Sequence, residues 1–446
     1  MKISSLPFGL ACISALIPIV SSLVGVNGYH LPVYLVLVVL FLIAMSNPNS
    51  FRFVFHRQLN WAIALMALLL ILQVFTGRGF VILGAGGYVL ILALIFYNLL
   101  LIGKASTVLV MRWLSFLFKF FIVGLIVEIG LISFGQQPLL VEIFTSSIVS
   151  NTTGYKNYNP ADVLRMAGLF QNEGGPNSIL LGSQIAGMLS LFAVIWFAFV
   201  KKSELAQRIT GYPSLWFVLS LAMLLATVNG MVFLVAILAI IIYRLFIREK
   251  QRVAFLVSIS LFLLVIYIFI SQGYLFARIF SSEPAFTTYQ LQVYAPYGLD
   301  RELEGISTID YYIFCFFNAV SLWLSAGWID KLLGVGAPFF LTDQVYITGD
   351  FGFATDVLLK SGLAWAATFL ATVLVICSSA LKLMATGSKE LQLWAGLGAT
   401  NALISILWLF STIHYNQAMQ NPGGNALFAL HLALVLYCRR RARALV

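Results

Sequence analysis

The sequence predicts an all-α polytopic membrane protein, because it is rich in apolar residues, contains apolar runs of membrane-spanning length, and distributes its basic residues unevenly. Of its 446 residues, 61% are hydrophobic and 9% are charged. Soluble domains carry about 25% charged residues, so this chain cannot build an ordinary solvated surface. The composition therefore argues against a soluble enzyme.

The apolar runs predict about twelve transmembrane helices, since about 20 apolar residues in a helix cross the hydrocarbon core of a bilayer. The second run is short, and the seventh and eighth are divided only by a tight turn at Asn229 and Gly230. The first run follows Met1 and Lys2 with no small-residue cleavage site, so we expect it to stay as a helix. The expected spans are 8–26, 31–46, 59–76, 81–102, 113–134, 178–200, 213–229, 230–247, 253–271, 353–381, 391–412 and 424–438.

The positions of the charges predict the orientation of these spans. The formal net charge is +10, and with a cytoplasmic amino terminus most of the Lys and Arg residues fall in cytoplasmic connectors. Most Asp and Glu residues fall on or near the outer face. The positive-inside rule therefore predicts that both termini are cytoplasmic. The basic balance reflects topology and attraction to anionic membrane lipids, and we expect no nucleic-acid partner.

Two long outer loops, about 135–177 and 272–352, interrupt a single integral membrane domain that covers residues 1–446. Loops of this size are uncommon unless they carry function. The larger one is rich in tyrosine, whose flat apolar face and hydroxyl suit either a sugar chain or anchoring at the membrane interface.

Residues 311–328 of the larger loop are apolar enough to resemble a further span. An extra crossing would place the basic segment 439–443 outside, against the positive-inside rule. We therefore expect a helix that lies at the outer interface or folds into the bundle.

The first outer loop carries candidate phosphate-binding residues in the segment RMAGLFQNEGGPNS, 165–178. Arg165 could bind a phosphate through two parallel hydrogen bonds, which lysine cannot copy. Asn172 and Asn177 lie close to the expected start of a helix, where backbone N–H groups favour anions. A simple helix cap is an equally good interpretation of Asn177.

The second outer loop carries candidate acid–base and phosphate-binding residues. Asp350 lies between Gly349 and Gly352, and a carboxylate near the membrane mouth can act as a general base toward a sugar hydroxyl. Arg278 and Arg301 lie in the same loop, and if they converge with Arg165 they would neutralise a diphosphate.

The last outer turn adds His414, at the outer end of an apolar run, and Tyr415 beside it. A neutral histidine can accept a proton from an attacking hydroxyl near neutral pH, and a structural hydrogen bond is an equally good interpretation. The four cysteines lie far apart and no cluster has metal-ligand spacing, so we expect no metal and no other cofactor.

Several of these segments resemble the bacterial O-antigen polymerase and O-antigen ligase superfamily. The similar features are RMAGLFQNEGGPNS (165–178), GVG (334–336), GDFGFATDVLLKSGL (349–363) and the two outer loops. The resemblance implies a GT-C-like, metal-independent glycosyltransferase of the bacterial inner membrane. It implies transfer of an undecaprenyl-diphosphate-linked glycan at the periplasmic face, with a separate chain-length regulator as an expected partner.

Within this superfamily the residues favour a polymerase. Arg165 matches the first-loop arginine of the family, whereas Asp350 stands where the ligases have a histidine. The alternatives are an O-antigen ligase that transfers glycan to lipid A-core, or a lipid-linked sugar flippase or other transporter. Transporters often show repeated halves and ionisable residues in mid-membrane, and this sequence shows no convincing repeat. We therefore predict an enzyme.

Overall fold

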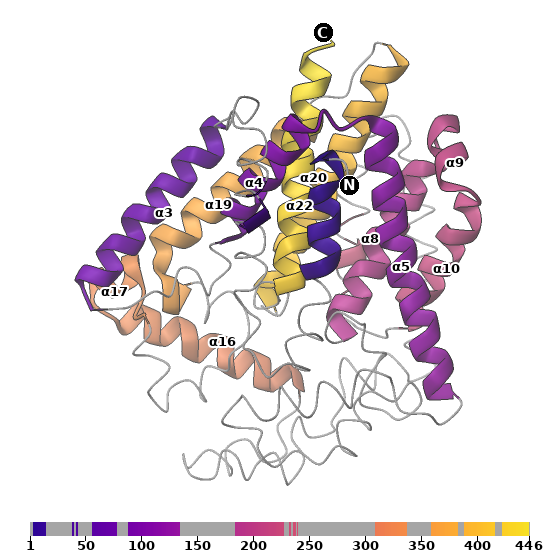
Figure 1. The fold of residues 1–446 in the computed structure, drawn as a ribbon. Helices are drawn as coiled ribbons and strands as arrows, with labels where there is room; N and C mark the ends of the chain where they lie inside the picture. The colour runs from indigo at the N-terminus through magenta and orange to yellow at the C-terminus, as the bar shows by residue number, and fades with distance from the viewer. Residues whose placement is uncertain are drawn as a thin grey trace, which may run out of the picture.

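The structure is a computed structural model, and it forms a bundle of helices that run between two ends (Figure 1). It describes residues 3–14, 38–39, 42, 56–77, 88–133, 183–226, 232, 235–237, 239, 308–336, 358–381, 388–414 and 422–445. The helices are η1 (Ile3–Ser5), α3 (Arg57–Phe75), α4 (Tyr88–Ile102), α5 (Thr107–Ser133), α8 (Ser183–Val200), α9 (Glu204–Thr210), α10 (Pro213–Ala226), α16 (Thr308–Ser325), α17 (Trp328–Leu333), α19 (Lys360–Leu381), α20 (Lys389–His414) and α22 (Pro422–Arg443).

Within the described ranges, four helices are long and apolar enough to cross a membrane: α3, α5, α19 and α20. A fifth span results if α9 and α10, which meet at a bend of 74°, are counted as one. These helices coincide with the predicted spans 59–76, 113–134, 353–381, 391–412 and 213–229. The helical, membrane-type fold is therefore supported. The full set of about twelve spans and the outer loops depend on residues outside the described ranges.

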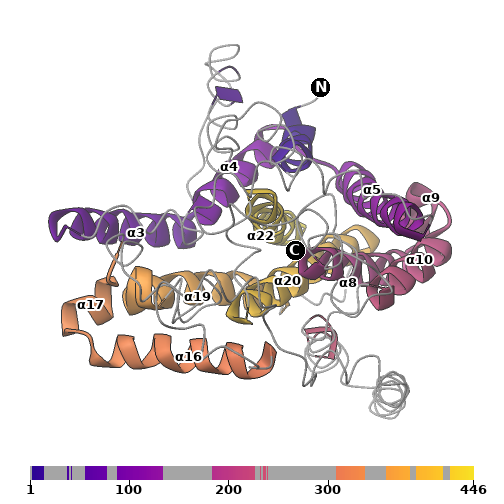
Figure 2. The ribbon, with the colours of Figure 1, turned by 90° about the horizontal axis from the view of Figure 1, so that it is seen from below.

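The helix α22 forms the centre of the bundle. Every residue from Ala426 to Cys438 is buried, and α22 packs against α20, α4 and α19. Viewed along its axis, α22 lies between α4 and α20 (Figure 2). A helix that is apolar all round is expected to be covered by protein or lipid on every side, and here the cover is protein.

Serine and proline residues fix where several helices begin. Ser106, Ser203 and Ser388 lie just before α5, α9 and α20, and the hydroxyl oxygen of each accepts a hydrogen bond from a backbone N–H in the first turn. Pro213 and Pro422 are the first residues of α10 and α22, where the missing N–H costs nothing. The cap at Ser106 starts α5 at Thr107, six residues before the predicted span 113–134.

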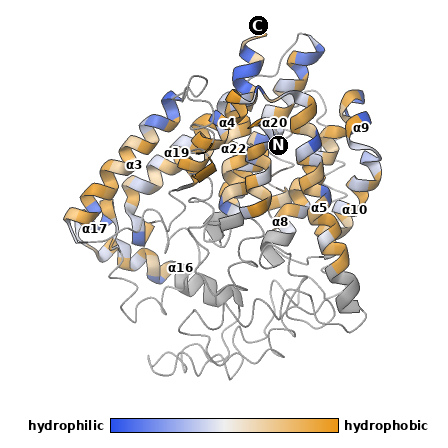
Figure 3. Ribbon diagram, viewed as in Figure 1, coloured by the Kyte–Doolittle hydropathy of each residue, from blue (hydrophilic) through white to orange (hydrophobic). Residues whose placement is uncertain are grey.

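Hydrophilic residues gather at one end of the bundle, where α3 and α20 begin and α22 ends (Figure 3). Arg57 and Lys389 open two of these helices, and three arginines lie in the last turn of α22. We refer to this end as the basic end. It is the end that the positive-inside rule assigns to the cytoplasm.

The helix α16 covers most of the segment 311–328 whose span was in question. Figures 1 and 2 both show α16 lying across the end of the bundle opposite the basic end, rather than alongside α22. The position of α16 at a membrane interface stays a prediction. The arrangement places α17 beside the ends of α3 and α19.

Lys119, which the sequence places inside a span, is held by the α9–α10 bend. Its Nζ donates a hydrogen bond to the carbonyl oxygen of Thr210 at 2.5 Å and lies 5.0 Å from the centre of the Trp216 ring. The ammonium therefore satisfies a carbonyl at the end of α9 and stacks on α10, which ties the bend to α5.

Candidate functional site

Most of the predicted site residues lie outside the described residues: Arg165, Asn172, Asn177, Arg278, Arg301, Asp350 and Tyr415. His414 is the last residue of α20, and its side chain also lies outside the described part. Because α20 begins at the basic end and continues for 26 residues, the backbone of His414 lies at the opposite end of the bundle. The convergence of these residues remains a prediction.

Two sequence motifs meet at this opposite end. The backbone N–H of Val335 donates to the carbonyl oxygen of Leu359 at 2.8 Å, and that of Gly336 donates to Lys360 at 3.2 Å. The GVG segment (334–336) is therefore hydrogen-bonded to the end of the segment 349–363. We call residues 332–336 and 359–362 together the glycine junction.

The close approach at the junction requires glycine at two positions. Gly334 and Gly362 have φ angles of +78° and +84°, a region that other residues rarely adopt. A Cβ atom on Gly334 would overlap the backbone of Lys360, and one on Gly362 would overlap the backbone of Leu332. Side chains at either position would force the two segments apart.

Polar side chains from α3 and α16 support the junction. The Gln73 side chain is fully buried, and its Nε2 donates to the carbonyl oxygen of Leu333 at 2.6 Å. Its Oε1 is also buried and has no hydrogen-bond partner among the described residues. On the other side, Trp323 donates from Nε1 to the carbonyl oxygen of Lys331 at 3.1 Å. Gln73 thus offers a free acceptor next to the junction.

Lys360 lies within the junction and is 2% exposed, and its neighbour Ser361 is 1% exposed. Lysine is almost never fully buried unless it is paired, so a buried lysine marks a specialised position. Lys360 falls within the predicted span 353–381 and Gln73 within 59–76, and neither was predicted as a site residue. Both stand out as polar residues within or beside apolar runs, and that signal could have identified them.

The junction combines the buried polar side chains of Gln73 and Lys360 with tightly turned backbone beside one end of the bundle. Buried polar groups of this kind hold the backbone around them in one arrangement. In the described part of the chain, no three His, Cys, Asp or Glu side chains gather as metal ligands would.

A second polar contact lies in the centre of the bundle. Nδ1 of His431 on α22 lies 2.7 Å from Oδ1 of Asn401 on α20, and both side chains are buried. The His431 ring also stacks on Phe118 of α5, with centroids 6.1 Å apart. Because three helices enclose this histidine, we interpret the contact as a link between helices rather than a reaction site.

No protein-family model matches the chain, and no curated protein or solved structure matches it either.

Proposed function

We propose that this protein is a glycosyltransferase of the bacterial inner membrane that joins undecaprenyl-diphosphate-linked oligosaccharide repeat units into a polysaccharide at the periplasmic face. The supporting observation is the glycine junction. Two of the motifs that carry the family resemblance, GVG and the end of 349–363, are hydrogen-bonded to each other at the end of the bundle away from the basic end.

In the proposed reaction, a hydroxyl of the newly flipped repeat unit attacks the sugar carbon that links the growing chain to its lipid diphosphate. A new glycosidic bond forms, the bond to the diphosphate breaks, and the undecaprenyl diphosphate leaves. Asp350 or His414 accepts the proton of the attacking hydroxyl. Arg165, with Arg278 and Arg301, stabilises the charge of the departing diphosphate.

The remaining candidates bind the sugars and the lipid-proximal phosphate. Asn172, Asn177 and Tyr415 supply hydrogen bonds and an aromatic face to the glycan. Lys360 and Gln73 are buried, so they act by holding the glycine junction in place beside the substrate. The expected protein partner is a chain-length regulator that acts with the polymerase.

The first test is deletion of the gene in its native host, with gel analysis of extracted lipopolysaccharide and plasmid complementation. A ladder that collapses to core plus one repeat unit supports the polymerase. Bare core without any repeat would point to the ligase or the flippase instead. An unchanged ladder would refute the assignment to O-antigen.

The second test replaces single residues in the complementing gene. Lys360→Gln should loosen the glycine junction and shorten the polymer, whereas Lys331→Gln, the control at the same end of the bundle, should keep the ladder. Arg165→Ala and Arg165→Lys should both shorten the polymer. Full polymer length in both Arg165 variants at normal expression would contradict phosphate binding by Arg165.

A further inference from the structure

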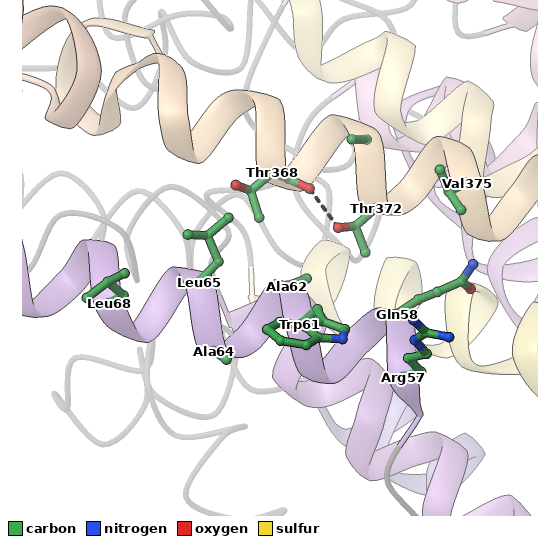
Figure 4. A pocket seen from close by; sticks show the side chains of 11 residues that line it. Arg57, Gln58, Trp61, Ala62, Ala64, Leu65, Leu68, Thr368, Thr372 and Val375 are labelled. Atoms are coloured by element: carbon green, nitrogen blue, oxygen red, sulfur yellow. Dashed lines mark hydrogen bonds between the residues drawn. The ribbon is translucent and has the colours of Figure 1, made fainter.

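A groove of about 730 Å³ runs between α3 and α19, away from the glycine junction (Figure 4). Its α3 wall begins with Arg57 at the basic end and continues along the helix to Leu68. Its α19 wall includes Thr368 and Thr372. The volume lies within the range of about 300–1,000 Å³ that is common for small-molecule sites.

Among the described residues, the arginines at the basic end of the groove have no acidic partners. Arg57 lines the groove, and the neighbouring Gln58 accepts a hydrogen bond from Nη1 of Arg439 at 3.5 Å. The Nε of Arg439 is buried and has no hydrogen-bond partner among the described residues. Within the same described ranges, neither arginine forms an ion pair with a carboxylate. The positive charges of Arg57 and Arg439 therefore favour binding of an anion from outside the described residues.

A neighbouring histidine reports the same positive potential. Burial lowers the pKa of His56, and the charges of Arg439, Arg440 and Arg443 lower it further. A cluster that disfavours one more positive charge favours a negative one by the same electrostatics.

Beyond the arginines, the α3 wall is apolar. Trp61, Leu65 and Leu68 follow one another at helical spacing on the same face and are 71%, 43% and 51% exposed. From Arg57 to Leu68 the helix advances by 11 residues and rises about 16 Å along its axis. That length is roughly half of the 30 Å hydrocarbon core, the depth of one leaflet.

The α19 wall offers no free hydroxyl hydrogen to a polar ligand. Oγ1 of Thr368 donates to the carbonyl oxygen of Ala364 at 2.7 Å. Oγ1 of Thr372 donates to the carbonyl oxygen of Thr368, also at 2.7 Å (Figure 4). Both threonines therefore satisfy their donors within α19. The groove combines one cationic end with an apolar length, which is the chemistry of an anionic phospholipid.

We propose that the α3–α19 groove binds one anionic phospholipid from the leaflet at the basic end, with its phosphate at Arg57 and Arg439 and an acyl chain along Trp61, Leu65 and Leu68. The positive-inside rule makes this the cytoplasmic leaflet. The site is separate from the glycine junction at the other end of α3, and it does not depend on the proposed glycosyl transfer.

Native mass spectrometry of the full-length protein in detergent tests the headgroup preference. Phosphatidylglycerol and phosphatidylcholine with identical acyl chains are added in turn. The double variant Arg57→Gln/Arg439→Gln should lose about tenfold in phosphatidylglycerol affinity, which corresponds to about 1.4 kcal/mol. The control Arg112→Gln/Arg208→Gln removes two exposed arginines from α5 and α9 and should bind as the wild type does. Equal affinity in the two double variants would overturn the proposal.

Photo-cross-linking in native membranes tests the occupant. A benzoylphenylalanine replaces Leu65 in the groove or, as a control, Val123, which is 46% exposed on α5. Cross-links at position 65 that are enriched in phosphatidylglycerol or cardiolipin relative to position 123 support the site. The same lipid profile at both positions would mean that the groove contacts only bulk lipid, which would refute the proposed site. Cross-links to another segment of this chain, or to a second copy, would show that protein covers the groove and would refute the proposal.

Discussion

The helices α3 and α20 are both apolar and of membrane-spanning length, yet they lie in different surroundings. In the apolar 18-residue stretch of each helix, 83% of α20 is buried within the protein but only 28% of α3. In water, the exposed apolar face of α3 would be costly, whereas lipid tails solvate it as well as other helices do. Apolar content therefore places a helix in a membrane but does not decide which of its faces contacts protein.

Polar residues mark the difference between the two regions. Asn401 of α20 and His431 of α22 pair in the centre, and Gln73 fixes the far end of α3 to α17. The exposed length of α3 instead ends in the arginine-lined groove. We call α20 and α22 the core, and α3 with α17 and the glycine junction the rim. Substitutions in the core and in the rim should therefore have different effects on stability.

A cavity in the core should lower the stability of the protein more than the same truncation in the rim. Phe428 of α22 is fully buried, with Trp408 and Phe369 each 6.1 Å away between ring centroids. Phe428→Ala should cost about 3–5 kcal/mol of stability. Phe75→Ala, at a residue of α3 that is 85% exposed, should cost little. Thermal unfolding in detergent measures both, and equal losses would contradict the distinction between core and rim.

A substitution at the glycine junction should weaken the packing of the rim without unfolding the core. Gly362→Ala should cost about 1–3 kcal/mol for the positive φ alone, in addition to the overlap with Leu332. Limited proteolysis should then cut near α17 and the end of α3 while α20 and α22 stay protected. Gly327→Ala is the control, because a Cβ there would meet only Asp330 Oδ2 at an ordinary 3.5 Å. A rim that resists protease in Gly362→Ala would argue against the junction as its anchor.

A smaller effect measures the polar link inside the core. A double-mutant cycle with His431→Leu and Asn401→Leu should give a coupling energy of about 0.6 kcal/mol, and no more than about 1.7 kcal/mol. The reason is that polar side chains in membranes find other partners when one is removed. Unfolding in a denaturing detergent series gives the four free energies of the cycle. Zero coupling would mean that the 2.7 Å contact does not link the helices energetically.

The smallest effect is a pH dependence at the basic end. The pKa of His56 is lowered from 6.5 by burial and by Arg439, Arg440 and Arg443, so the folded state disfavours its protonation. Its contribution to stability is fully present above pH 6.5 and is lost as the pH falls through the lowered value, because the unfolded chain then takes up the proton first. The pH profile of unfolding for His56→Gln should be flatter there. An identical profile would assign the dependence to other groups.

Composition and hydropathy predicted the helices of the bundle well, because long apolar runs leave the backbone no other way to satisfy its hydrogen bonds in lipid. They did not predict the early start of α5, which depends on a single serine cap. The two motifs of the glycine junction are visible in the sequence, but their contact is not. Hydrophobic periodicity reports local structure and does not show which distant segments pair. The buried state of Lys360 was missed for the same reason, since burial follows from tertiary packing.

The central position of α22 has a consequence for biosynthesis. Translation reaches α22 after every other described helix, yet α22 contributes the side chains around which α4, α19 and α20 close. Before α22 is synthesised, the faces of α4, α19 and α20 that pack against it have no protein partner there. A chain interrupted before α22 would therefore lack the helix on which α4, α19 and α20 pack, and the apolar surface left open would favour misassembly.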